Sequence, residues 1–241
     1  MNGTLVNGSP PSLLGITIRR AATSGRFFLV YGTVMATLLS IALAATGGAA
    51  FSSAIPLLLP IFGVVGSMGG LMVFTNDRLK GVLEYLMAYG IPPRRLFLDV
   101  LETSLLLLTI VLGIALGAGV SFYLARGHPL PGNFVVFVCA YTLPMSYVSS
   151  AFAATAGMFW TTLSSPREGM NSPIGLIPLI GVLPPVATLM IVVLVGATGT
   201  VTPSGFFEVA AAMMTGVAVF VVVLLSLTGR LLRRERLLSP A

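Results

Sequence analysis

The chain has 241 residues, of which 56% are hydrophobic and only 8% are charged, and its mean hydropathy is +1.01. A soluble domain carries about 25% charged residues, so this chain cannot cover a globule with polar surface. The composition excludes a soluble enzyme and predicts an all-α polytopic membrane protein. The formal net charge of +6 follows from basic residues at the membrane edge, so no nucleic-acid partner is expected.

The first predicted element, over residues 10–25, is an amphipathic helix that lies in the membrane interface. Leu14, Ile18, Ala21 and Ala22 fall on one helical face. Arg19, Arg20 and Thr23 fall on the other. A flexible tail is the alternative interpretation of this segment.

Six apolar runs follow, each long enough to cross a bilayer, because a membrane-spanning helix needs roughly 20 apolar residues. They lie at about 27–48, 54–75, 97–124, 133–158, 174–197 and 206–229. The chain therefore divides into an N-terminal tail with the interfacial helix (1–26), a six-span transmembrane domain (27–229) and a basic tail (230–241).

The basic residues orient the predicted spans. Of the 13 Lys and Arg residues, only Arg126 falls on one side of this topology. Basic loops remain in the cytoplasm, so we expect both termini to be cytoplasmic and the protein to be a multi-pass protein of the cell (plasma) membrane. Membrane lipids, in particular anionic lipids, are sufficient partners for this charge.

Small residues and prolines mark how the spans pack. Glycines recur four residues apart in the second span, at Gly66 and Gly70, and in the third, at Gly113 and Gly117. This spacing predicts close approach of helix backbones. In the fifth run, the adjacent prolines Pro184 and Pro185 predict a kinked or broken helix.

No catalytic or metal-binding constellation stands out. His128 is the single histidine and Cys139 the single cysteine, and no phosphate-binding loop occurs. We therefore predict no enzyme activity, metal site or cofactor in this chain. Asp99 lies four residues after Arg95, so the two are expected to bridge. No carboxylate falls in mid-span, which disfavours an ion-coupled carrier.

The longest polar interruption is NDRLKGVLEYLMAYGIPPRR, which starts at Asn76. Asp77 is predicted to cap a helix that runs to about Ile91, where Pro92 and Pro93 end it. Its apolar stripe comprises Leu79, Val82, Leu83, Leu86 and Met87, and Lys80, Glu84 and Ala88 lie opposite. Such a helix either lies flat on lipid or docks into the groove of a partner.

This stretch resembles a motif of the permease subunits of ABC transporters of the type-2 exporter family. The residues that carry the resemblance are Asp77, Arg78, Gly81, Leu83, Glu84 and Leu86, followed by the prolines and a basic pair. The resemblance implies that residues 77–91 are a cytoplasmic coupling helix between spans two and three. It also implies that the interfacial helix is the family's connecting helix.

The resemblance further implies partners and a function. We expect a permease subunit of an ATP-driven exporter, working as a homodimer with two copies of a separate ABC ATPase subunit that holds ATP and Mg. The residues of the motif are then expected to couple to that ATPase, with Leu83 as anchor and Glu84 facing the ATPase. The second and fifth spans are expected to line the substrate path. The alternatives are an ion-coupled secondary carrier and a non-transport membrane scaffold subunit.

Overall fold

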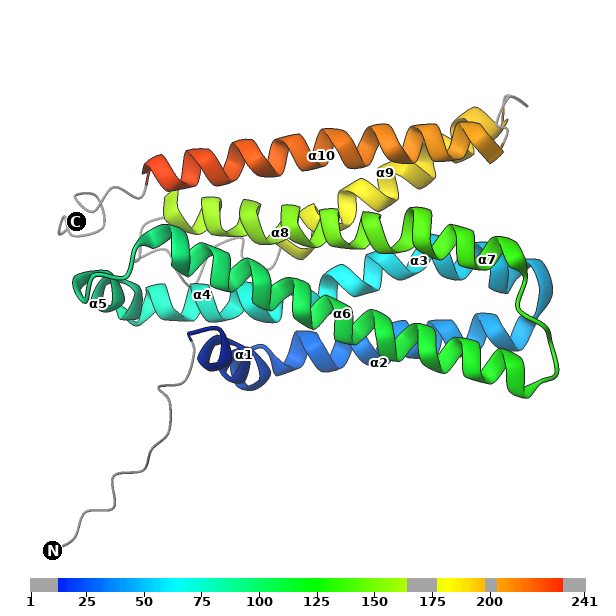
Figure 1. The fold of residues 1–241 in the computed structure, drawn as a ribbon, viewed down its shortest axis with the longest axis horizontal. Helices are drawn as coiled ribbons and strands as arrows, with labels where there is room; N and C mark the ends of the chain where they lie inside the picture. Colours follow the sequence, from blue (N-terminus) through cyan, green and yellow to red (C-terminus); the bar gives the residue numbers. More distant parts are fainter. Residues whose placement is uncertain (1–12, 164–176, 198–202, 232–241) are drawn as a thin grey trace, which may run out of the picture.

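The computed structural model describes residues 13–163, 177–197 and 203–231, and within these ranges all regular structure is helical (Figure 1). The elements are α1 (Leu13–Ser24), α2 (Arg26–Thr46), α3 (Gly48–Ser67), α4 (Gly69–Leu79), α5 (Val82–Ala88), α6 (Pro93–Ala125), α7 (Gly132–Phe137), the π-helical turn η1 (Val138–Thr142), α8 (Leu143–Leu163), α9 (Ile177–Ala197) and α10 (Pro203–Leu231). The predicted all-α class is confirmed for this part of the chain.

Five stretches of helix are long and apolar enough to cross a membrane. They are Arg26–Thr46, Ala54–Arg78, Arg94–Ala125, Gly132–Trp160 and Gly205–Thr228. These match the first four predicted runs and the sixth. The fifth predicted run corresponds to α9, where the described apolar stretch is the shorter Ile180–Leu194. The chain thus has the make-up of a polytopic membrane protein.

The long helices lie side by side in one elongated bundle (Figure 1). α2 packs against α3 and α6, while α8 packs against α9 and α10, and α3 contacts helices of both groups. α1, α5, the start of α6 and the end of α10 gather at one end of the bundle, which we call the α5 end. α6 carries the chain to the other end, where Arg126 follows it and donates from Nη1 to the Ala45 carbonyl over 2.8 Å.

Glycine allows α2 to pack closely on α3. A Cβ atom built on Gly32 would lie 2.5 Å from the Cα of Gly66, which is backbone and cannot move aside. A Cβ on Gly70 would lie 2.5 Å from the Ser104 hydroxyl oxygen of α6. The predicted close approach is therefore confirmed for both Gly66 and Gly70. Gly66 lies against α2, and Gly70 lies against α6.

The second glycine pair behaves differently. A Cβ on Gly113 or Gly117 would meet no described atom within 4 Å, and both residues are exposed. The predicted close approach is wrong for this pair within the described chain, because the two glycines lie on the face of α6 that points away from the neighbouring helices.

Two prolines lie inside α9 without ending it. The helix continues through Pro184 and Pro185, so the predicted break does not occur. The Thr188 hydroxyl donates to the Pro184 carbonyl over 2.9 Å. Gly181 brings α9 close to its neighbours, since a Cβ there would lie 2.5 Å from the Ala153 Cβ of α8.

The fourth span contains a wider turn. α7, η1 and α8 follow one another without a gap, and the Leu143 amide donates to the Val138 carbonyl five residues earlier. The Thr142 hydroxyl donates to the Pro56 carbonyl of α3 over 3.0 Å. The next residue back, Tyr141, is fully buried. The π turn thus places one polar and one aromatic side chain against neighbouring helices.

The packing around Gly32 yields a stability prediction. Gly32→Ala is expected to lower the free energy of unfolding by about 1–3 kcal/mol, the usual cost of overpacking a tight core. Gly113→Ala is the matched control, where open space leaves stability unchanged or slightly raised, because alanine favours helix. Thermal unfolding of the two purified variants in detergent measures the difference. Equal stability of the two variants would contradict the close contact.

Candidate functional site

The predicted single helix over residues 77–91 is wrong. Asp77 lies in the last turn of α4, which ends at Leu79, and α5 is a separate helix of 7 residues. The chain turns at Gly81, whose φ of 69° and ψ of 12° lie in the left-handed region. Glycine adopts this conformation readily because it has no Cβ. The left-handed residue ends α4, so Asp77 does not cap α5.

A second glycine ends α5. Gly90 has a φ of 88°, and its amide donates to the Met87 carbonyl over 2.9 Å. The Ile91 amide donates to the Leu86 carbonyl over 3.2 Å. These two bonds form a Schellman cap, which satisfies carbonyls at a helix end. The prolines follow the cap, and Pro93 is the first residue of α6, so they begin a helix rather than end one.

α5 has a buried face and an exposed face. Leu83 and Met87 are 7% and 5% exposed and join a core cluster with Phe74 of α4 and Phe97 of α6. This confirms the central part of the predicted apolar stripe. Leu83 therefore anchors the helix, as expected. The partly buried Leu86 packs against the same cluster.

The exposed face carries two tyrosines that the sequence analysis did not single out. Tyr85 and Tyr89 are 60% and 72% exposed. Their ring centroids lie 4.6 Å apart, and the Tyr85 hydroxyl donates to that of Tyr89 over 3.0 Å. This hydrogen bond raises the pKa of Tyr85 above its usual value. The sequence does show that the two tyrosines are four residues apart, a spacing that places both on one helical face.

The remaining predicted coupling residues are spread over the turn. Gly81 is exposed and Arg78 is partly buried. The side chains of Leu79 and Glu84 lie outside the described part of the structure. The structure thus brings Gly81, Leu83 and Leu86 into one turn and helix, but it does not bring Asp77 to the exposed face.

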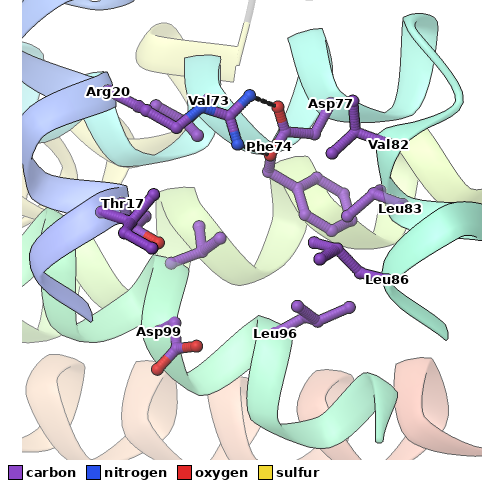
Figure 2. Close-up of a pocket in the computed structure, with 12 residues that line it drawn as sticks. Thr17, Arg20, Val73, Phe74, Asp77, Val82, Leu83, Leu86, Leu96 and Asp99 are labelled. Atoms are coloured by element: carbon purple, nitrogen blue, oxygen red, sulfur yellow. Dashed lines mark hydrogen bonds and ion pairs between the residues drawn. The ribbon is translucent and has the colours of Figure 1, made fainter. Parts of the chain in front are cut away.

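Asp77 instead forms an ion pair with α1. It is 5% exposed, and Arg20 Nη1 donates to Asp77 Oδ2 over 2.7 Å (Figure 2). Arg20 Nη2 contacts Asp77 Oδ1 as well, so the pairing is bidentate, the geometry that gives Arg–carboxylate pairs strength and direction. Arg20, which the helical pattern places opposite the apolar face of α1, thus reaches Asp77 of α4 with its guanidinium while its side chain stays 38% exposed.

A cavity of about 130 Å³ lies between α1, α4, α5 and α6. Its apolar walls include Phe74, Leu83, Leu86 and Leu96 (Figure 2). The Arg20–Asp77 pair lines one part of it and Asp99 another. The predicted bridge between Arg95 and Asp99 is wrong, since no ion pair forms between these two described residues. Asp99 Oδ2 is buried without a hydrogen-bond partner in the described structure.

The described residues contain no group of three His, Cys, Asp or Glu side chains able to hold a metal ion. No protein-family model, curated protein or solved structure matches the chain. What the α5 end does is therefore inferred from its own geometry: an anchored short helix, an exposed tyrosine pair, a buried ion pair and a cavity.

The ion pair yields a second prediction. Removing one partner of a buried pair leaves a charge without compensation, while the 38% exposure of the Arg20 side chain moderates the effect. A double-mutant cycle with Arg20→Gln and Asp77→Asn is expected to give a coupling free energy of about 1–2 kcal/mol. Hydrogen exchange in α1 should accelerate in each single variant. Arg19→Gln, a change at an exposed neighbour, serves as control, and a coupling energy of zero would contradict the pairing.

Proposed function

We propose that the chain is the transmembrane permease subunit of an ATP-driven ABC exporter, and that α5 receives a separate ATPase subunit. The observation that carries the proposal is the division of α5 into two faces. Leu83 and Met87 anchor it in the bundle, whereas Tyr85 and Tyr89 project from it. A pair of exposed aromatic side chains on an anchored helix is typical of a protein-binding surface.

The anchoring supports a mechanical role. α5 contacts the core cluster through both α4 and α6, by way of Phe74 and Phe97. These helices belong to the second and third candidate spans. A force applied to the outer face of α5 would therefore reach both spans. A partner that closes when it binds ATP can bias two packings of the bundle in this way.

The topology and assembly form part of the proposal. The six spans would include α9 as the fifth, and the α5 end would face the cytoplasm. Supporting this orientation, the described basic residues Arg19, Arg26, Lys80, Arg94 and Arg95 lie in α1, at the starts of α2 and α6, and directly after α4, whereas Arg126 follows the far end of α6. The working unit would be a permease homodimer in the plasma membrane with two ATPase subunits, which hold ATP and Mg. In this arrangement the chain itself is not an enzyme.

One alternative is an ion-coupled carrier, which would need a carboxylate inside the membrane. Asp77 lies near the end of α4, Asp99 and Glu102 near the start of α6, and Glu208 near the start of α10. These positions, near the ends of their helices, disfavour the ion-coupled carrier.

The proposal is tested by purifying the tagged full-length chain from its native membrane and reconstituting it in lipid vesicles. An ATPase subunit is expected to co-purify, and the vesicles should hydrolyse MgATP in a vanadate-sensitive manner. The absence of a co-purifying ATPase under mild solubilisation would make the proposal wrong.

Glu84→Ala in the same preparation tests the predicted contact with the ATPase. We expect transport-coupled ATP hydrolysis to fall several-fold while dimer formation and expression stay near wild type, because a charge at a partly buried interface contributes more than an exposed one. Glu102→Ala is the matched control, an exposed acid on α6. If the two variants behave alike, Glu84 is a solvated surface charge.

The substrate path is tested separately on α9. Single cysteines placed along residues 176–190 in a Cys139→Ser background should be labelled with helical periodicity, in a pattern that changes with nucleotide. The expectation follows from the proposed path along the second and fifth spans. Uniform protection of all positions in every nucleotide state would contradict it.

A further inference from the structure

We propose that α3 contains a hinge at Pro60, and that the hydroxyl of Thr142 is a latch that fixes the angle of this hinge. The inference does not depend on the proposed transport function. It follows from a buried hydrogen bond between two helices, from the backbone donor that proline removes, and from the way the hydrophobic core divides along α3.

Pro60 deprives α3 of one backbone donor. In an α-helix each carbonyl accepts from the amide four residues later, and the residue four positions after Pro56 is Pro60, which has no N–H. The Thr142 hydroxyl of η1 donates to the Pro56 carbonyl over 3.0 Å, and both residues are buried. Side-chain hydroxyls commonly satisfy the carbonyls that prolines free in membrane helices. Thr142 thus takes the place of the amide that Pro60 lacks.

The Thr142 hydroxyl has two acceptors within reach. Besides the Pro56 carbonyl, it lies 3.4 Å from the carbonyl oxygen of Phe137, in its own span. A hydroxyl carries a single hydrogen, so a full-strength bond goes to one carbonyl at a time. Bonded to Pro56, the hydroxyl ties α3 to η1. Bonded to Phe137, it keeps a partner when α3 moves away, so release of α3 does not leave a buried donor unpaired.

The hydrophobic core divides at the same point of α3. Leu59 belongs to a core cluster formed with residues of α2, α6 and α7. Val64, the next buried hydrophobic residue of α3, belongs to a second cluster, which contains Leu83 of α5. The backbone between Leu59 and Val64 therefore joins two separately packed groups of side chains, and Pro60 lies within it. A helix bends most readily at such a proline.

The helices that pack on this part of α3 are also irregular. The π turn η1 and the proline-containing α9 both contact α3. A Cβ built on Gly181 of α9 would lie 2.7 Å from Cγ1 of Val64. Gly181 precedes Pro184 by about one turn and Val64 follows Pro60 by about one turn, and α3 and α9 run in opposite directions (Figure 1), so the prolines lie at a similar depth. By contrast, α2, α6 and α10 contain no proline beyond their first residue.

The hinge links the two ends of the bundle. α4 and α5 follow the second half of α3 and share its core cluster, so a bend at Pro60 changes the position of α5 relative to the opposite end. Hinges that absorb a movement within a few residues are a common form of conformational change. The hydrogen bond between Thr142 and Pro56 then sets how often the bend occurs.

The first test asks whether the hydroxyl replaces the missing amide, by thermal unfolding of the full-length chain in detergent. Thr142→Val removes the hydroxyl at nearly constant shape and leaves the Pro56 carbonyl unpaired, so we expect the unfolding midpoint to fall by about 2–4 °C. Thr142→Ser, which keeps a hydroxyl, should stay near wild type. Pro60→Ala restores an amide, so Thr142→Val should have little effect in that background. An equal loss in both backgrounds would overturn the latch.

The second test measures the bend in lipid nanodiscs by electron paramagnetic resonance. Spin labels replace the exposed residues Ala88 of α5 and Asn133 of α7 in a Cys139→Ser background, and report the distance between the two ends. We expect a broader distance distribution or a second population in Thr142→Val, and the wild-type distribution in Thr142→Ser. Labels at Ala125 and Asn133, which follow one another at the same end, are the control pair and should not change.

The two tests separate a latch from a merely structural bond. A lower midpoint in Thr142→Val with unchanged distances between the ends would overturn the hinge. If Thr142→Val fails to fold, the double variant with Pro60→Ala is still expected to unfold at the same temperature as Pro60→Ala alone, and to show the wild-type distance distribution. A double variant that also fails to fold, where Pro60→Ala folds, would overturn the proposal.

Discussion

The α5 end depends on the ion pair between Arg20 and Asp77. α1 is a short amphipathic helix, and its buried Ala21 packs against Val73 of α4 and Leu107 of α6. A carboxylate buried at the end of α4 requires a positive partner, and α1 is the element that provides one. The pair thus places α1 against α4 and closes one side of the cavity.

Two glycines set the shape of the neighbouring segment. Gly81 and Gly90 take left-handed conformations at the two ends of α5, which turns the chain sharply twice within a few residues. α5 therefore lies across the end of the bundle instead of extending α4 into solvent. This is why its apolar residues reach the core while its tyrosines remain exposed. The two faces of α5 therefore depend on the backbone conformations of Gly81 and Gly90 as well as on the side chains of the helix.

Much of this architecture follows from the sequence, and the exceptions have physical causes. Hydropathy identified the five helices that are long and apolar enough to cross a membrane, and helical periodicity identified Leu83 and Met87, because both signals are local. The Arg20–Asp77 pair joins residues 57 positions apart, so no local pattern could reveal it. The helix boundary at Gly81 was missed because glycine is also tolerated within a helix, and only its left-handed conformation ends α4. Gly113 and Gly117 show that equal spacing does not imply an equal environment.

The π turn in the fourth span has a consequence for how this protein compares with its relatives. A π turn holds one residue more than an α-helical turn, and each residue of an α-helix rotates the chain by about 100°. Loss of one residue between Phe137 and Leu143 would remove the wide turn yet leave the faces of α7 and α8 where they are. Loss of one residue elsewhere in the span would rotate every side chain beyond it onto the wrong face. Homologues of different length in this span are therefore expected to differ at η1, which makes the turn the natural position for an alignment gap.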